Sequence, residues 1–202
     1  VTVLKQKQLL PINLTTLKHI YLLAANQQEL AALTIALEIT LVKKLSTENL
    51  ASLFIHKLNA QSTSLSSSLS KMNNKINPRT DILIASVDIK TASLVDLGGM
   101  DDLTPSYGST RDQQTKLTYQ TMLTEQLTQA KSRHLPTVLI AKGSPFLLAP
   151  YRGLVDTLLL NYDDRIYQNN NQQLISPGFN ASMQVIFETG KGLGQLPVTL
   201  EP

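Results

Sequence analysis

Short apolar runs alternate with longer segments of helical periodicity along this sequence of 202 residues. The helical spacing is clearest in two segments, 27–37, where Leu30, Leu33 and Leu37 fall on one face, and 111–133. The apolar runs that suit buried strands are 20–24, 81–87, 136–141 and 155–160. Because strands that alternate with helices usually join into a parallel sheet, this pattern predicts an α/β domain.

Weaker patterns predict the elements that lie between these. Apolar residues indicate a strand at 39–42, and Ser46 precedes a helical pattern that continues through Leu53 and Phe54. The Ser-rich segment 61–70 keeps leucines at helical spacing, so it is predicted as a helix rather than a linker. The elements predicted near the end of the chain are a helix at 179–187, a glycine turn at 190–194 and a strand at 197–200.

Together these elements predict a flavodoxin-like three-layer sandwich, in which a mostly parallel sheet carries helices on both faces. A chain of this length is predicted to form a single domain, 1–202. In open sheets of this kind, the loops that contact ligands follow the carboxyl ends of the strands. That rule places the long loop 88–110 and the segment 143–146 on one rim, and loops of such length are often functional or line an interface.

Composition narrows the classes of function. The net charge of +3 and the pI near 9.1 come from scattered Lys and Arg that form no basic run, which argues against a nucleic-acid partner. The absence of cysteine excludes disulfides and thiolate metal sites and leaves the compartment open. The longest apolar runs are too short for a membrane segment. Because the chain opens with Val1 instead of Met, in a segment that already looks like part of a structured element, it is interpreted as a processed or excised fragment.

Several segments are similar, in order, to those of one known family. They are V-T-V-L-K at 1–5 followed by L-L-P at 9–11, the apolar runs at 81–84 and 136–140, G-S-P-F at 143–146, and V-I-F at 185–187 with G-Q-L-P-V-T at 194–199. In this order they resemble the C-terminal domain of family 3 glycoside hydrolases, most closely the two-domain β-N-acetylhexosaminidase branch. The resemblance implies that this domain belongs to a larger protein whose catalytic barrel lies outside the chain.

The resemblance also implies a supporting role. In that family the nucleophilic Asp belongs to the barrel, so this domain would pack on the barrel of the same parent chain and border a carbohydrate site. The parent would hydrolyse terminal β-linked N-acetylglucosamine, and the fragment alone would be inactive. No catalytic, cofactor-binding or metal-binding residue and no cofactor are expected in this part. The residues expected at the domain interface or cleft rim are Asp88, Asp101, Asp102, Ser144 and Phe146.

Two alternatives stay open. The β-glucosidase branch of the same family often carries an acid/base Glu on a loop of this domain, but the loop 88–110 contains no Glu, and only Asp96, Asp101 and Asp102 could substitute. The other alternative is a stand-alone flavodoxin-like ligand-binding or interaction module that uses the same rim. Flavin is its most obvious ligand, yet residues 24–27 (A-A-N-Q) provide no Ser/Thr-rich phosphate loop.

The remaining candidate residues are given structural interpretations. His19, His56 and His134 are expected on a strand lead-in, a helix and a loop, and no metal-ligand spacing relates them, so they are interpreted as surface or packing residues. Ser144 lacks the setting of a nucleophile elbow, because Pro145 follows it directly.

Overall fold

A computed structural model describes residues 1–6, 9–59, 77–89, 110–163, 165–192 and 194. At its centre lies a six-stranded sheet with the strand order β1-β6-β5-β4-β2-β3. The strands are β1 (Thr2–Gln6), β2 (His19–Ala24), β3 (Phe54–Asn59), β4 (Asp81–Ile89), β5 (Thr137–Gly143) and β6 (Thr157–Asn161). Neighbouring strands are parallel, except that β1 pairs with β6 in the antiparallel sense. This is the flavodoxin-like order with one added edge strand, so the predicted fold class is confirmed.

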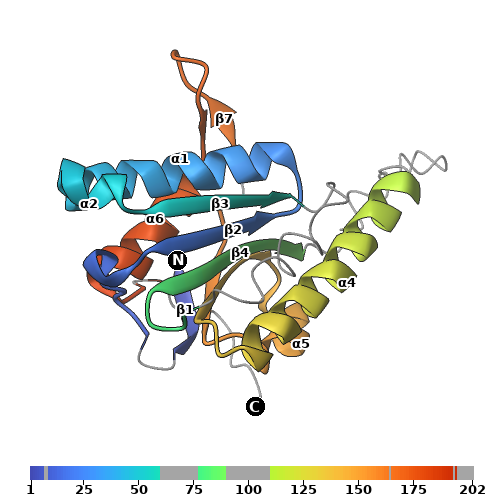
Figure 1. The fold of residues 1–202 in the computed structure, drawn as a ribbon. Coiled ribbons are helices and arrows are strands. Elements are labelled where there is room, and N and C mark those ends of the chain that lie inside the picture. Colours follow the sequence, from blue (N-terminus) through green and yellow to red (C-terminus); the bar gives the residue numbers. More distant parts are fainter. Residues whose placement is uncertain (7–8, 60–76, 90–109, 164, 193, 195–202) are drawn as a thin grey trace.

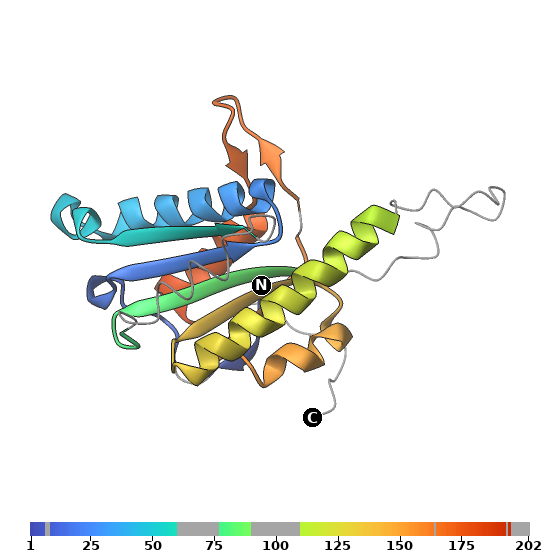
Figure 2. The ribbon, with the colours of Figure 1, turned by 45° about the vertical axis from the view of Figure 1, so that its right-hand side comes forward.

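Helices cover both faces of the sheet (Figure 1). On one face lie α1 (Gln27–Lys44) and α6 (Pro177–Gln184), and on the other lie α4 (Thr110–Ser132) and the short α5 (Ala149–Arg152) (Figure 2). The smaller elements are α2 (Thr47–Ala51), the 3-10 turns Leu14–Thr16 and Pro145–Leu148, the π-helical turn Val185–Thr189, and a hairpin of β7 (Tyr167–Gln168) and β8 (Leu174–Ile175). The hairpin projects beside α1 (Figure 1).

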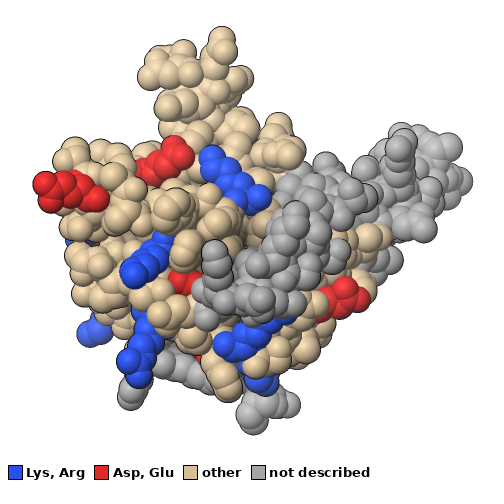
Figure 3. Space-filling model, in the orientation of Figure 1, with Lys and Arg blue, Asp and Glu red and all other residues tan. Residues whose placement is uncertain are grey.

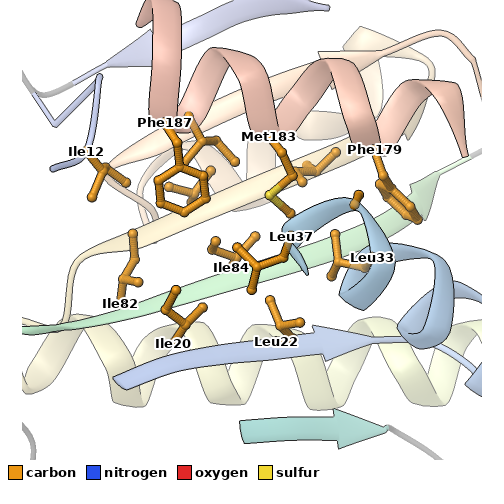
Figure 4. Packing of buried hydrophobic residues seen from close by; sticks show 14 of the residues in the cluster. Ile12, Ile20, Leu22, Leu33, Leu37, Ile82, Ile84, Phe179, Met183 and Phe187 are labelled. Carbon is orange, nitrogen blue, oxygen red and sulfur yellow. The ribbon is translucent and has the colours of Figure 1, made fainter. Parts of the chain in front are cut away.

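Alternate side chains of the buried strands fill two separate cores. Ile84 and its neighbours at alternate positions pack against Leu33 and Leu37 of α1 and Met183 of α6 (Figure 4). The side chains of the opposite face, such as Leu83, pack against α4 and α5. Burial on both faces explains why these strands read as continuous apolar runs. Each fully buried Leu or Ile contributes about 1.5–3 kcal/mol, so the two cores hold the layers together.

Helix α1 is longer than the sequence pattern indicates. Asn26 caps it, since its Oδ1 accepts a hydrogen bond of 2.9 Å from the backbone N–H of Glu29. The helix continues to Lys44, so the strand predicted at 39–42 is wrong. Thr40 and Leu41 are both buried, whereas Ile39 before them and Val42 after them are exposed, which is the pattern of a helix with one covered face. The apolar run misled the prediction because its β-branched residues favour strands by intrinsic propensity, while packing against the sheet keeps them in the helix.

The next segment also departs from expectation. The helix after Ser46 ends at Ala51, and Phe54 opens the edge strand β3 instead of continuing the helix. His56 therefore lies on a strand and not on a helix. Edge strands are half exposed and mix polar with apolar residues, so their pattern is hard to distinguish from that of an amphipathic helix.

The C-terminal helix agrees with its prediction within two residues. It begins at Pro177 behind the cap of Ser176, and its last turn, Val185–Thr189, is π-helical. Gly190 ends it with φ of 64°, a left-handed conformation that favours glycine, which confirms the turn there. The predictions for 61–70, for the loop residues 90–109 and for 197–200 fall outside the described residues.

No helix in the described part of the chain is both long and apolar enough to cross a membrane. On the face drawn in Figure 3, Lys and Arg side chains are spread among uncharged atoms instead of forming one continuous band. The positive net charge is therefore not concentrated on that face.

Candidate functional site

The carboxyl ends of the parallel strands gather at one edge of the sheet. Strands β2, β4, β5 and β6 end there at Ala24, Ile89, Gly143 and Asn161. The chain leaves β2 toward β3 on one side, and the next strand, β4, lies on the other side of β2. This reversal is the topological switch point, the place where open α/β sheets bind ligands.

Near this edge, the strand positions that face α1 and α6 change from apolar to polar residues. Residues at alternate positions of a strand share a face, so Ser86 and Asp88 continue the line of Ile84 in β4. In the same way Lys142 follows Ile140 in β5, and Asn161 follows Leu159 in β6. A layer of polar side chains therefore closes the core that lies beneath α1 and α6.

A buried ion pair holds this layer together. The ammonium of Lys142 donates to Oε1 of Glu29 in the first turn of α1 over 2.6 Å, and the two side chains are only 4% and 8% exposed. Ser86 donates a longer hydrogen bond, 3.4 Å, to Oε2 of the same carboxylate. The Lys142 ammonium also lies 5.5 Å from the centroid of the Phe179 ring, within cation–π range. A helix N-terminus favours a carboxylate, which suits Glu29 to this position.

Tyr119 connects the layer to the opposite face of the sheet. Its hydroxyl, on α4, donates to the backbone oxygen of Ser86. Burial, reinforced by the negative charge of Glu29, raises the pKa of Tyr119 well above its ordinary value of 10.0. The phenol thus keeps its proton and its hydrogen bond above pH 10, where an ordinary tyrosine ionises.

Asn161 and the start of α6 form the far side of the layer. The Oδ1 atom of Asn161 accepts a hydrogen bond of 3.0 Å from the N–H of Asp163, while its buried Nδ2 has no hydrogen-bond partner among the described residues. A Cβ atom on Gly178 would lie 2.0 Å from that Nδ2, so only glycine lets the N-terminus of α6 approach this closely. The Nδ2 group is a donor that a ligand or water could satisfy.

The structure places the rim residues expected from the sequence at different distances from this layer. Asp88 is partly exposed and lies directly opposite Lys142 in the β4–β5 register. Ser144 is partly exposed two residues beyond Lys142, and Phe146 is 63% exposed in the following 3-10 turn. Asp101 and Asp102 lie outside the described residues. A functional role for any of these five residues stays a prediction.

Sequence reasoning missed Glu29, Lys142 and Asn161, which the fold brings together. Glu29 and Lys142 are 113 positions apart, and neither belongs to a motif. The sequence does carry a signal for Lys142 and Asn161. Each is a polar residue near the end of an otherwise apolar strand, β5 and β6, at a position that faces α1 and α6. In a buried strand such a residue needs a partner, because an unpaired charge in the core is costly.

A second polar group lies on the α4 side of the sheet, at the other end of β2 and β3. The Nδ1 atom of His19 and the Nε2 atom of His56 share a hydrogen bond of 3.1 Å. Burial, and secondly the neighbouring His19, lower the pKa of His56 below 6.5. Burial and the charge of Asp81 raise the pKa of Tyr21, beside them, to about 12. His134 lies elsewhere, after α4, so the structure relates two histidines that the sequence treated as independent.

Fold and site together define a flavodoxin-like α/β domain with a buried polar layer at the carboxyl edge of its sheet. Comparison with known proteins finds no matching family model and no matching curated protein. One similar solved structure is the sugar isomerase domain of an RpiR transcription factor from Sphaerobacter thermophilus, with 15% sequence identity and a TM-score of 0.43. The match covers 86% of this chain and 70% of that one.

These findings overturn the assignment to family 3 glycoside hydrolases. No family model matches the chain, and a solved structure that it resembles is a sugar isomerase domain and not a glycoside hydrolase. The accessory role beside a catalytic barrel, the hexosaminidase activity of a parent enzyme and the carbohydrate site between the two domains are therefore wrong. The physical reason is that buried apolar strands, a glycine after a helix and short polar loops recur in any doubly wound domain, so their order along the chain does not distinguish one family.

Proposed function

We propose that this chain is a ligand-binding domain whose site for a small polar molecule lies at the carboxyl edge of the sheet. The observation that carries the proposal is the buried pair of Lys142 and Glu29 at the topological switch point. Apolar residues of similar volume would often serve stability as well as a buried ion pair or better. A pair retained at the edge where such sheets bind ligands therefore favours a role in recognition.

The charges favour a neutral ligand. Lys142 is already neutralised by Glu29, and a phosphate could use the ammonium only by displacing that carboxylate. Two buried groups of the layer match the hydroxyl or amide groups of an uncharged polar molecule: the Asn161 amide, whose Nδ2 has no hydrogen-bond partner among the described residues, and the Ser86 hydroxyl, whose hydrogen bond to Glu29 is long at 3.4 Å. We therefore infer a ligand rich in such groups, held by hydrogen bonds.

Titration calorimetry tests the proposal with a panel of polyols, neutral sugars, nucleosides and their phosphorylated counterparts. Ser144→Tyr places a bulky side chain on the rim and should abolish binding of any neutral ligand found. Ser52→Tyr is the matched control, because Ser52 is exposed just before β3, at the amino end of the sheet. Binding that survives Ser144→Tyr, or that requires the phosphate, would refute the proposed site or its chemistry.

A further inference from the structure

The pair of histidines on β2 and β3 has a geometry that the proposed ligand site does not use. The parallel register sets His19 opposite Phe54 and Tyr21 opposite His56, so the four rings lie on one face. His19 stacks on Phe54 with centroids 5.4 Å apart, and Tyr21 stacks on His56 at 4.6 Å. The aromatic neighbours and the sheet backbone thus fix both imidazoles.

The separation of the two ring nitrogens suits a shared metal ion. The Nδ1 of His19 lies 3.1 Å from the Nε2 of His56. Two imidazole nitrogens bound to one tetrahedral Zn²⁺ are separated by about 3.3 Å, as the usual Zn–N distances require. In the neutral pair one proton lies between these nitrogens. When a metal ion takes the place of the shared proton, the proton moves to the other nitrogen of the imidazole that carried it. Each imidazole then keeps one N–H, and no proton is released.

The surroundings also favour a cation. Asp81 lies next to His19 in the β2–β4 register on the same face and is almost fully buried, and its negative charge acts on both His56 and Tyr21. Both histidines are partly exposed, and Phe54 beside them is 58% exposed at the edge of the sheet. The two imidazoles therefore lie at a partly solvent-exposed edge of the sheet.

We propose that His19 and His56 form a binding site for a borderline divalent transition-metal ion, with Zn²⁺ as the representative. Imidazole is a preferred ligand of such ions, and strands hold ligands more precisely than loops do. Among the described residues, no group of three His, Cys, Asp or Glu side chains could hold a metal. Water completes the coordination, which leaves the ion open to exchange. This site stands apart from the proposed ligand site and does not depend on it.

Zinc chloride alone, added to the full chain without an affinity tag, tests the proposal. In long-range ¹H–¹⁵N spectra of the imidazoles, Nδ1 of His19 and Nε2 of His56 should shift together, and a chelator should reverse the change. By calorimetry, His56→Gln should weaken zinc binding by about tenfold or more, since even the loss of an outer-shell partner commonly costs that much.

The third histidine provides the control. His134 is exposed with φ of 57°, so His134→Asn suits its backbone and should leave the affinity unchanged. Zinc shifts confined to His134, or equal affinity in the wild type and His56→Gln, would overturn the proposal. If His56→Gln fails to fold, the nitrogen-specific shifts of the wild type decide alone, because their absence at His19 and His56 refutes the site.

Discussion

Replacing Lys142 by Met should strongly destabilise the fold. The substitution preserves most of the side-chain volume but leaves the Glu29 carboxylate, 8% exposed, without its partner at 2.6 Å. Only the long hydrogen bond from Ser86 would then remain to that carboxylate from the described side chains. A buried charge that loses its partner cannot recover its hydration, so the loss exceeds the value of the contact itself.

The size of the effect follows from this burial. Breaking a buried pair from one side costs about 3–5 kcal/mol, a large fraction of the stability of an ordinary domain. Glu29→Gln should cost a similar amount, because it leaves the Lys142 ammonium unpaired. The double variant Glu29→Gln with Lys142→Met leaves no unpaired charge at this ion pair, so it should be more stable than the two single losses added together predict.

Urea unfolding followed by circular dichroism measures these free energies. Arg165→Met is the matched comparison. Arg165 pairs with Asp163 at 2.8 Å, a distance similar to that of the Lys142–Glu29 pair, but the Arg165 side chain is 76% exposed. Solvent screens such a pair, and its loss should barely move the unfolding midpoint. If Lys142→Met were as mild as Arg165→Met, or if the single losses were additive, the polar layer would not be the buried, coupled unit described above.

Two further predictions concern packing and pH. Gly178→Ala should destabilise the fold by about 1–3 kcal/mol, because its Cβ would overlap the amide of Asn161. Gly153→Ala is the control and should be neutral, because the space around Gly153 is open. Thermal unfolding of the two variants measures the difference. Above pH 10 the unfolded chain loses the Tyr119 proton that the folded chain keeps, so the free energy of unfolding should fall by about 1.4 kcal/mol per pH unit from this group. Tyr119→Phe should make that decline shallower in urea unfolding between pH 9.5 and 11, and an identical slope would contradict the raised pKa.

The parts of the fold that could be predicted are those where burial is complete. Strands β4, β5 and β6 carry nearly continuous apolar runs, and α4 keeps its buried stripe at Leu123, Leu127 and Ala130. The edge strand β3 and the hairpin β7–β8 were missed, because exposed strands need no apolar pattern. The helix α1 was cut short because its outer face is also apolar at Ile39 and Val42.

The candidate site could be located only in part. The rule that ligand-contacting loops follow strand ends placed Asp88 and Ser144 at the carboxyl edge of the sheet, and the structure has them there, while their role stays a prediction. The partners Glu29 and Lys142 could not be found, because their pairing depends on how α1 packs on β5, a contact between distant parts of the chain. The pair of His19 and His56 escaped for a related reason, since it depends on the register of β2 with β3.

The claim that the carboxyl edge of the sheet binds the ligand is tested most directly by amide NMR of the ¹⁵N-labelled chain, titrated with a neutral ligand found by calorimetry. The account predicts chemical-shift changes concentrated at Asn26, Gly143, Ser144, Asn161 and Asp163, around the end of the polar layer. Changes that leave these amides unmoved and gather elsewhere in the chain would contradict it.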